Sequence, residues 1–123
     1  DVLKVKHIMV VGHYGCGGVR AALSHEEYGL IDNWLRALKA LYHLHRKQFT
    51  RLTDEQRVDL LCELNVQRQV RNVCHTTIVQ NAWKRGQSLS VHGWIYGLQD
   101  GLVKDMGVTI ESAQALDDSF LYE

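Results

Sequence analysis

The sequence contains no proline, only three cysteines and no surplus of charge of either sign. Fourteen basic residues balance fourteen acidic ones, so no overall field favours nucleic acid or an anionic membrane as a partner. The cysteines are odd in number and lack a disulfide-framework spacing, which favours a reducing, cytoplasmic location. No apolar run approaches the roughly 20 residues that span a bilayer. We therefore expect one domain over residues 1–123, with neither nucleic acid nor a membrane as partner.

Three segments have the pattern of strands. Residues 7–12 form a nearly continuous apolar run that ends in glycine, which is typical of a strand buried on both faces of a parallel sheet. Residues 89–96 alternate with a period of two, and after a turn at Asp100 and Gly101, residues 102–110 predict a weaker edge strand. The expected fold class is α/β, with a mostly parallel central sheet flanked by helices.

Two long helices are expected between the first two strands. Apolar residues recur at three- and four-residue intervals over 31–45 and again over 58–78, and the second helix is expected to continue to Gly86. The capping-box spacing occurs ahead of each helix, in Ser24 with Glu27 and in Thr53 with Gln56. The tail from residue 111 onward is expected to be a helix packed outside.

A glycine-rich loop over residues 12–18 follows the first strand, where open α/β sheets place their ligand sites. It carries His13 and Cys16, an imidazole and a thiol of the kinds that zinc prefers. A His-x-x-Cys pair also arises by chance, so the spacing alone leaves metal binding open.

Other glycine-rich motifs do not fit this loop. The dinucleotide fingerprint would need glycine where Arg20 stands after Gly15 and Gly17, and no Gly-Lys-Ser/Thr of a P-loop follows. The loop of cysteine phosphatases has a longer spacing between its cysteine and arginine than Cys16 and Arg20 have.

Over most of its length the sequence resembles the β-class carbonic anhydrases, most closely the bacterial type. The stretch HIMVVGHYGCGGV over residues 7–19 is similar to the second signature of that family. Further similar stretches are GLIDNWL (29–35), LCELNV (61–66), AWKRGQ (82–87), HGWIYG (92–97) and DGL (100–102). The resemblance extends to about residue 108 and implies the fold of that family, incomplete at its N-terminal side.

The resemblance implies a Zn²⁺ cofactor and the reversible hydration of carbon dioxide to bicarbonate. His13 and Cys16 match two of the zinc ligands, Gly17 is expected to contact the substrate, and Tyr96 matches a residue that helps to bind a regulatory bicarbonate. The other cysteine ligand and the catalytic Asp/Arg pair belong to a Cys-x-Asp-Ser-Arg motif on an earlier strand, which this sequence lacks. No catalytic residue is therefore expected in this segment, which alone should be inactive.

Cys62 and Cys74 lie on the apolar stripe of the second helix, where thiols are commonly structural, and so do not replace the absent ligand.

Two interpretations of the chain remain open. The start at Asp1, inside apolar sequence, favours the C-terminal two-thirds of a carbonic anhydrase that forms a homodimer or homotetramer. The alternative is a non-catalytic remnant or interaction module that keeps the dimer-forming helices without a functional zinc site.

Overall fold

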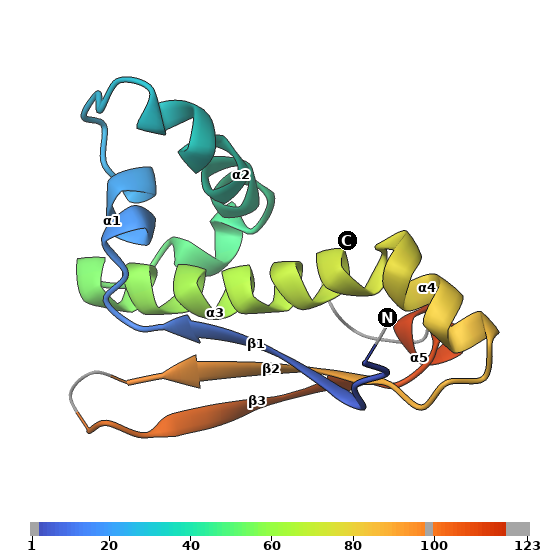
Figure 1. Ribbon diagram of the computed structural model, residues 1–123. Coiled ribbons are helices and arrows are strands. Elements are labelled where there is room, and N and C mark those ends of the chain that lie inside the picture. The colour runs from blue at the N-terminus through green and yellow to red at the C-terminus, as the bar shows by residue number, and fades with distance from the viewer. Residues whose placement is uncertain (1–2, 98–99, 118–123) are drawn as a thin grey trace.

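A computed structural model describes residues 3–97 and 100–117. In chain order (Figure 1) its elements are β1 (His7–His13), α1 (Gly17–Leu23), α2 (Ile31–Leu44), the 3-10 helix η1 (Arg46–Phe49), α3 (Asp54–Cys74), α4 (Thr77–Lys84), β2 (Ser90–Tyr96), β3 (Val103–Ile110) and α5 (Ala113–Asp117). Within these residues, no helix is both long enough and apolar enough to cross a membrane.

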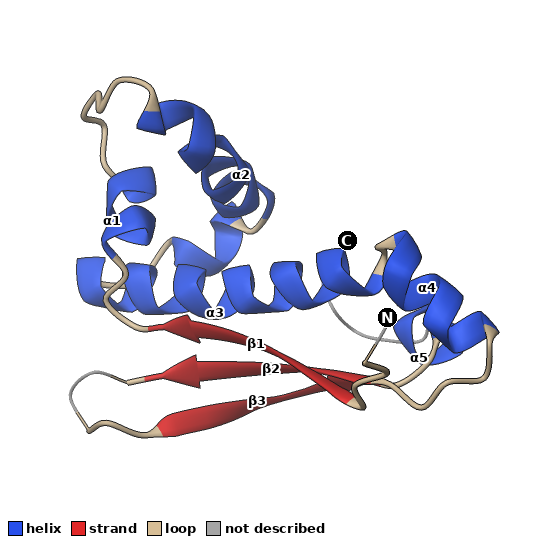
Figure 2. Ribbon diagram, viewed as in Figure 1, coloured by secondary structure: helices blue, strands red, loops and turns tan. Residues whose placement is uncertain are grey.

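The sheet has the strand order β1-β2-β3, with β1 parallel to β2 and β3 antiparallel to β2. Helix α3 lies along one face of this sheet. Helix α1 follows the carboxyl end of β1, and α1 and α2 lie on the side of α3 away from the sheet (Figure 2). The arrangement confirms the expected α/β class and the edge position of the third strand. It also places the end of β1, and the loop that follows, beneath α1.

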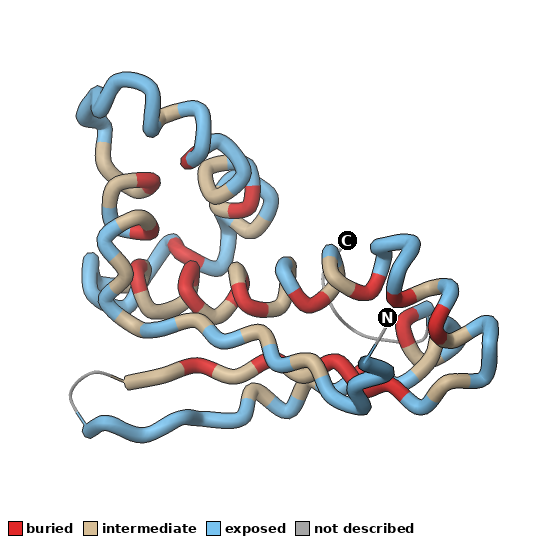
Figure 3. Tube along the Cα trace, in the orientation of Figure 1, coloured by how far each residue is buried: buried red, intermediate tan, exposed pale blue. Residues whose placement is uncertain are grey.

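Strand β1 is buried on one face only, so the prediction of burial on both faces is wrong for this structure. Ile8 and Val10 face α3 and are half-buried, whereas Met9 and Val11 are 52% and 54% exposed. The reason is the one-sided covering of the sheet, because α3 packs on one face and none of the described helices lies on the other (Figure 3). Among the described strands, β1 also pairs only with β2, which leaves its second edge open.

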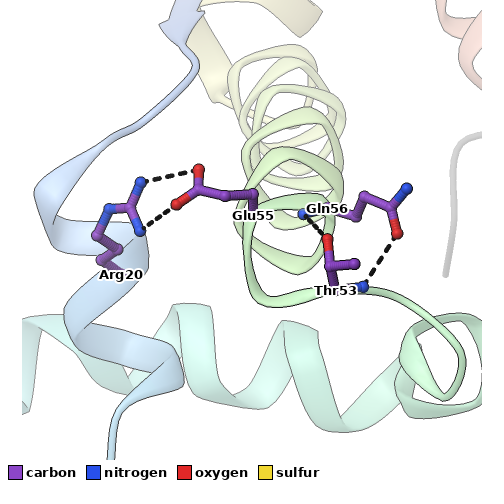
Figure 4. Close-up of polar contacts among 4 residues, drawn as sticks. All are labelled: Arg20, Thr53, Glu55 and Gln56. Carbon is purple, nitrogen blue, oxygen red and sulfur yellow. Dashed lines mark hydrogen bonds and ion pairs between the residues drawn. The ribbon is translucent and has the colours of Figure 1, made fainter.

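The capping prediction holds for one helix and fails for the other. Thr53 accepts from the backbone N–H of Gln56, and the Gln56 side chain accepts from the backbone N–H of Thr53, which confirms a capping box at the start of α3 (Figure 4). Ser24 instead ends α1, and α2 begins only at Ile31. Gly29, at φ 78°, interrupts the helical path between them, so the Ser24 spacing does not lead directly into a helix.

The long second helix is divided into α3 and α4 at Thr76. The Thr76 hydroxyl accepts from the N–H of Val79 and donates to the carbonyl of Val73, so it starts α4 and closes the end of α3. The end of the helical region at Gly86 is confirmed, since α4 stops at Lys84 and Gly86 takes a positive φ of 76°. The expected tail helix is present as α5, and residues 118–123 lie outside the described part.

Two glycines of the sheet let α3 approach closely. A Cβ at Gly12 would lie 2.6 Å from Cγ2 of Val66, and a Cβ at Gly93 would lie 3.0 Å from Cγ2 of Val70. Gly12 and Gly93 belong to neighbouring strands, while both valines are fully buried on α3. Glycine in a strand commonly marks such a close approach. This contact therefore fixes the height of α3 above the sheet, immediately before the loop that carries His13.

We predict that Gly12→Ala lowers the free energy of unfolding by about 1–3 kcal/mol, because the added methyl group overpacks against Val66. Val66→Ala in the same molecule should relieve the clash, so the double variant should lose less stability than the sum of the two single changes. Gly17→Ala serves as the control, since a Cβ there meets nothing within 4 Å. Chemical denaturation measures the four variants and the unchanged protein, and additive effects of Gly12→Ala and Val66→Ala would contradict the contact.

Candidate metal centre

The loop that carries His13 and Cys16 is held at the carboxyl ends of β1 and β2. His13 is the last residue of β1 and lies opposite Tyr96, the last residue of β2. The backbone N–H of Tyr14 then donates to the carbonyl of Tyr96 at 3.0 Å, so the loop stays hydrogen-bonded to β2 beyond the end of the strand. Two parallel strands therefore position the start of this loop, as the sequence predicts.

The His13 ring is oriented by the backbone. Its Nδ1 lies 3.0 Å from the carbonyl oxygen of Tyr14. A carbonyl oxygen only accepts hydrogen bonds, so Nδ1 carries the proton and Nε2 of the neutral ring keeps its lone pair. The side chain is exposed, and metal-binding histidines commonly have their second nitrogen fixed in this way. His13 is thus prepared to offer Nε2 to an ion.

Cys16 lies on the same turn, at the N-cap of α1. Gly15 takes a φ of 69° just before it, a left-handed conformation that glycine adopts without strain. The carbonyl of Cys16 accepts from the N–H of Arg20 at 3.0 Å, which makes the cysteine the first residue tied into α1. Its thiol is partly exposed and free of any disulfide. The turn therefore presents an imidazole nitrogen and a thiol sulfur from one short segment.

The donor types fit zinc, but the number of donors does not complete a site. An imidazole and a thiolate are two of the four ligands of a tetrahedral zinc centre. Within residues 3–97 and 100–117, no cluster of three or more His, Cys, Asp or Glu side chains could hold a metal ion. The described residues thus offer two of the four donors that a tetrahedral zinc site needs.

Cys62 and Cys74 do not supply the missing ligands. Both thiols are buried on α3, as the sequence predicts, and burial raises their pKa values, that of Cys74 to about 11. Backbone hydrogen bonding from Cys16 and Gly15 partly offsets the rise of the Cys62 pKa, and Cys16 packs against the buried cluster that contains Cys62. Cys62 therefore supports the loop from below, a role that its position in the sequence does not reveal.

Tyr14 joins the loop to α3 from the side. Its hydroxyl donates to Oε2 of Glu63 at 3.1 Å in a partly buried contact. Burial first, and then the hydrogen bond and the negative charge of Glu63, raise the pKa of Tyr14 to about 12. This pair could not be predicted from the sequence, because nothing in the spacing of Tyr14 and Glu63 indicates a contact across 49 residues.

An exposed ion pair holds α1 against the start of α3. The guanidinium of Arg20 contacts both carboxylate oxygens of Glu55, at 2.9 Å and 3.1 Å (Figure 4). The hydrogen bond and the charge of Arg20 hold the pKa of Glu55 below its usual range. Exposed pairs contribute little to stability. The two-point geometry instead orients α1, whose first turn carries the cysteine.

The remaining predicted site residues lie close to this loop. Gly17 is the exposed first residue of α1, with open space where a side chain would stand. Tyr96 is half-buried on the uncovered face of the sheet, opposite His13. A separate pocket of about 420 Å³ opens beside Tyr14, but neither His13 nor Cys16 lines it. The structure thus brings the predicted residues together, while their roles stay predictions.

The protein has an α/β fold with a glycine-rich loop after a parallel strand. Comparison with known proteins shows its family. The carbonic anhydrase family model matches residues 1–103. A carbonic anhydrase of Emericella nidulans is 44% identical over 107 residues, which cover 86% of this chain and 47% of that protein. A carbonic anhydrase of Pseudomonas aeruginosa is 30% identical over 108 residues. The chain belongs to the carbonic anhydrase family.

Solved structures place the chain in the β class of that family. The β-carbonic anhydrase of Coccomyxa, solved in complex with acetazolamide, matches with a TM-score of 0.87 and 40% identity over 93% of this chain and 52% of that one. Tetrameric β-carbonic anhydrases of Sordaria macrospora match with a TM-score of 0.79 and 33% identity over 88% of this chain and 55% of theirs. The chain spans about half the length of the curated relatives it matches, less than the two-thirds expected. Because fungal and bacterial relatives both match, the bacterial type stays a prediction.

We predict that Tyr14→Phe makes the stability of the protein less sensitive to alkaline pH. A pKa raised from 10 to about 12 means that the folded state favours the neutral phenol. This contribution is complete below pH 10 and is lost as the pH rises to about 12, so the phenylalanine variant should lack that part of the decline. At neutral pH the lost hydrogen bond should cost about 0.5–1.5 kcal/mol.

Tyr28→Phe is the matched control, because the Tyr28 hydroxyl donates to Glu26 at 3.2 Å in an exposed contact. Urea denaturation at pH 7, 10 and 11.5 gives the free energy of unfolding of each protein. Equal alkaline declines for the unchanged protein and Tyr14→Phe would show that the Tyr14 contact does not stabilise the fold.

Proposed function

We propose that this chain supplies part of a zinc centre that catalyses the reversible hydration of carbon dioxide to bicarbonate and a proton. One observation carries the proposal: the Tyr14 carbonyl orients the His13 ring so that Nε2 is available on the same turn as the Cys16 thiol. That turn lies at the carboxyl end of β1, in a chain of the carbonic anhydrase family.

The chemistry of the site divides between the ion and the residues that hold it. A bound zinc ion supplies a water whose pKa falls to about 7 and which can therefore act as a nucleophile near neutral pH. Nε2 of His13 and the deprotonated Sγ of Cys16 would hold this ion. The hydrogen bond from Tyr14 to Glu63 and the buried Cys62 keep the loop in place while His13 and Cys16 bind the ion.

The other ligands and the Asp/Arg pair would come from polypeptide outside residues 1–123. Two features support this part of the proposal. The described residues cannot complete a metal site by themselves. Strand β1 also has an unpaired edge among the described strands, next to the loop, where a further strand can hydrogen-bond and bring its ligands to His13.

We propose a homodimer or homotetramer for the whole protein. Related structures include tetrameric β-carbonic anhydrases. The start of α2 exposes Leu30 and Trp34, which are 84% and 81% accessible, and large apolar side chains of this kind commonly lie in subunit contacts. A cytoplasmic location rests only on the cysteine content and stays a prediction.

Two further roles rest on the resemblance alone. Gly17 is proposed to contact carbon dioxide or bicarbonate, since no side chain blocks the space beside it. Tyr96, which lies opposite His13, is proposed to help bind a regulatory bicarbonate.

A non-catalytic interaction module is the second candidate. The incomplete ligand set of the described residues favours it, because a module without chemistry needs no complete zinc site. The two candidates differ in what His13 and Cys16 do when the rest of the protein is present. Only the enzyme requires both side chains to bind one ion.

We predict that Cys16→Ser in the full-length protein abolishes both zinc binding and carbon dioxide hydration, because a neutral hydroxyl is a far poorer zinc ligand than a thiolate. Metal analysis and a stopped-flow hydration assay measure the two quantities. Cys74→Ala is the control, since this buried thiol should leave zinc content unchanged while costing some stability. Full activity of Cys16→Ser would exclude the zinc role, and an inactive, zinc-free parent protein would favour the interaction module.

A further inference from the structure

A pair of imidazoles crosses the sheet at the end opposite the His13 loop. Nδ1 of His7, the first residue of β1, lies 3.1 Å from Nε2 of His92 in β2, and the ring centroids are 5.3 Å apart. The neighbours Val91 and Gly93 are buried beneath α3, so His92 projects from the uncovered face, where His7 is exposed. The two rings therefore meet on an open surface of the described structure.

The third strand fixes the orientation of this pair. Oγ1 of Thr109 in β3 lies 3.0 Å from Nδ1 of His92. Whichever atom donates, this hydrogen bond holds the His92 ring and leaves Nε2 directed at His7. Histidines that bind metals characteristically have their second nitrogen held by such a partner, which orients the ligand. One side chain from each strand thus contributes to a single arrangement.

We propose that His7 and His92 together bind a divalent late transition metal ion such as Ni²⁺ or Cu²⁺, at a site separate from the His13 and Cys16 centre. The separation of 3.1 Å between the nitrogens is the distance expected for two ligands of one ion. With metal–nitrogen bonds of about 2.0–2.1 Å, it corresponds to an angle of about 98° at the ion. This angle suits neighbouring ligands in the tetragonal geometry of Ni²⁺ and Cu²⁺, with water in the other positions.

Binding replaces the hydrogen bond between the rings by two metal–nitrogen bonds. Each ring must then offer a lone pair, so the ring that held the proton between Nδ1 of His7 and Nε2 of His92 takes a proton on its other nitrogen instead; solvent accepts the first proton and supplies the second, with no net release. For His7 the other nitrogen is Nε2 on an exposed side chain, and for His92 it is Nδ1, which then donates to Oγ1 of Thr109. The ion then links β1 to β2 at the start of β1, the strand whose second edge is unpaired. The ion would thus cross-link the two strands and hold β1 in register with β2.

The test is a titration of the zinc-loaded full-length protein with Ni²⁺, followed by calorimetry and thermal unfolding. The unchanged protein should bind one additional Ni²⁺ and unfold at a higher temperature in its presence. His7→Ala and His92→Ala should each abolish this binding and this rise, with their zinc content unchanged. Thr109→Val keeps both imidazoles but loses the orienting hydroxyl, so its Ni²⁺ affinity should fall about tenfold or more.

His25→Ala, which removes an exposed imidazole from the loop after α1, is the matched control and should bind Ni²⁺ like the unchanged protein. Cys16→Ser should also keep the Ni²⁺ site, so failure of the proposed zinc centre and failure of this site are distinguishable. If His92→Ala does not fold, His7→Ala and Thr109→Val decide the outcome. No additional Ni²⁺, or equal binding in His7→Ala, would overturn the proposal.

Discussion

The packing of α3 onto two glycines of the sheet is the contact on which the rest of this structure depends. Val66 and Val70 occupy the space that side chains at Gly12 and Gly93 would fill, so the helix lies closer to β1 and β2 than it otherwise could. A void or an added methyl group here would shift the whole helix, because protein interiors are close-packed. Gly12 directly precedes His13, so this packing also sets the start of the ligand loop.

The same helix then supports the loop from two directions. Cys62 lies beneath Gly15 and Cys16, and Glu63 accepts the hydrogen bond of Tyr14 from the side. Neighbouring residues of α3 thus hold both halves of the turn between His13 and Cys16. Ligands held by such supporting contacts keep their geometry before the ion arrives, which lowers the cost of binding it.

What could be predicted from the sequence depended on local patterns. The strand periods, the capping box at Thr53 and the position of the loop after β1 each arise from residues close together in the chain, and all are found in the structure. The division of the long helix at Thr76 depends on the competition of one hydroxyl with helix continuation, which periodicity does not reveal. The prediction that both faces of β1 are buried is wrong for a different reason. The exposure of Met9 depends on which distant segments cover the sheet.

Contacts between distant segments could not be predicted. The pairs Tyr14–Glu63 and His7–His92 join residues 49 and 85 positions apart, and only the register of the strands and the height of α3 bring them together. The loop that carries His13 and Cys16 contains one feature that the sequence predicts and one that it does not. His13 and Cys16 are predicted as ligands by their place after a strand and by the family resemblance, whereas the orientation of the His13 ring depends on a carbonyl that the sequence does not distinguish from any other.

We propose that residues 1–123 hold half of a zinc centre in a preformed loop and that polypeptide outside them completes it. Equilibrium dialysis against buffered zinc measures this directly, on the chain alone and on the chain mixed with the upstream polypeptide of the full-length protein. We expect little bound zinc for the chain alone, and one zinc per complex once the second polypeptide is present. Stoichiometric, equally tight zinc binding by residues 1–123 alone, or no gain from the second polypeptide, would contradict this account.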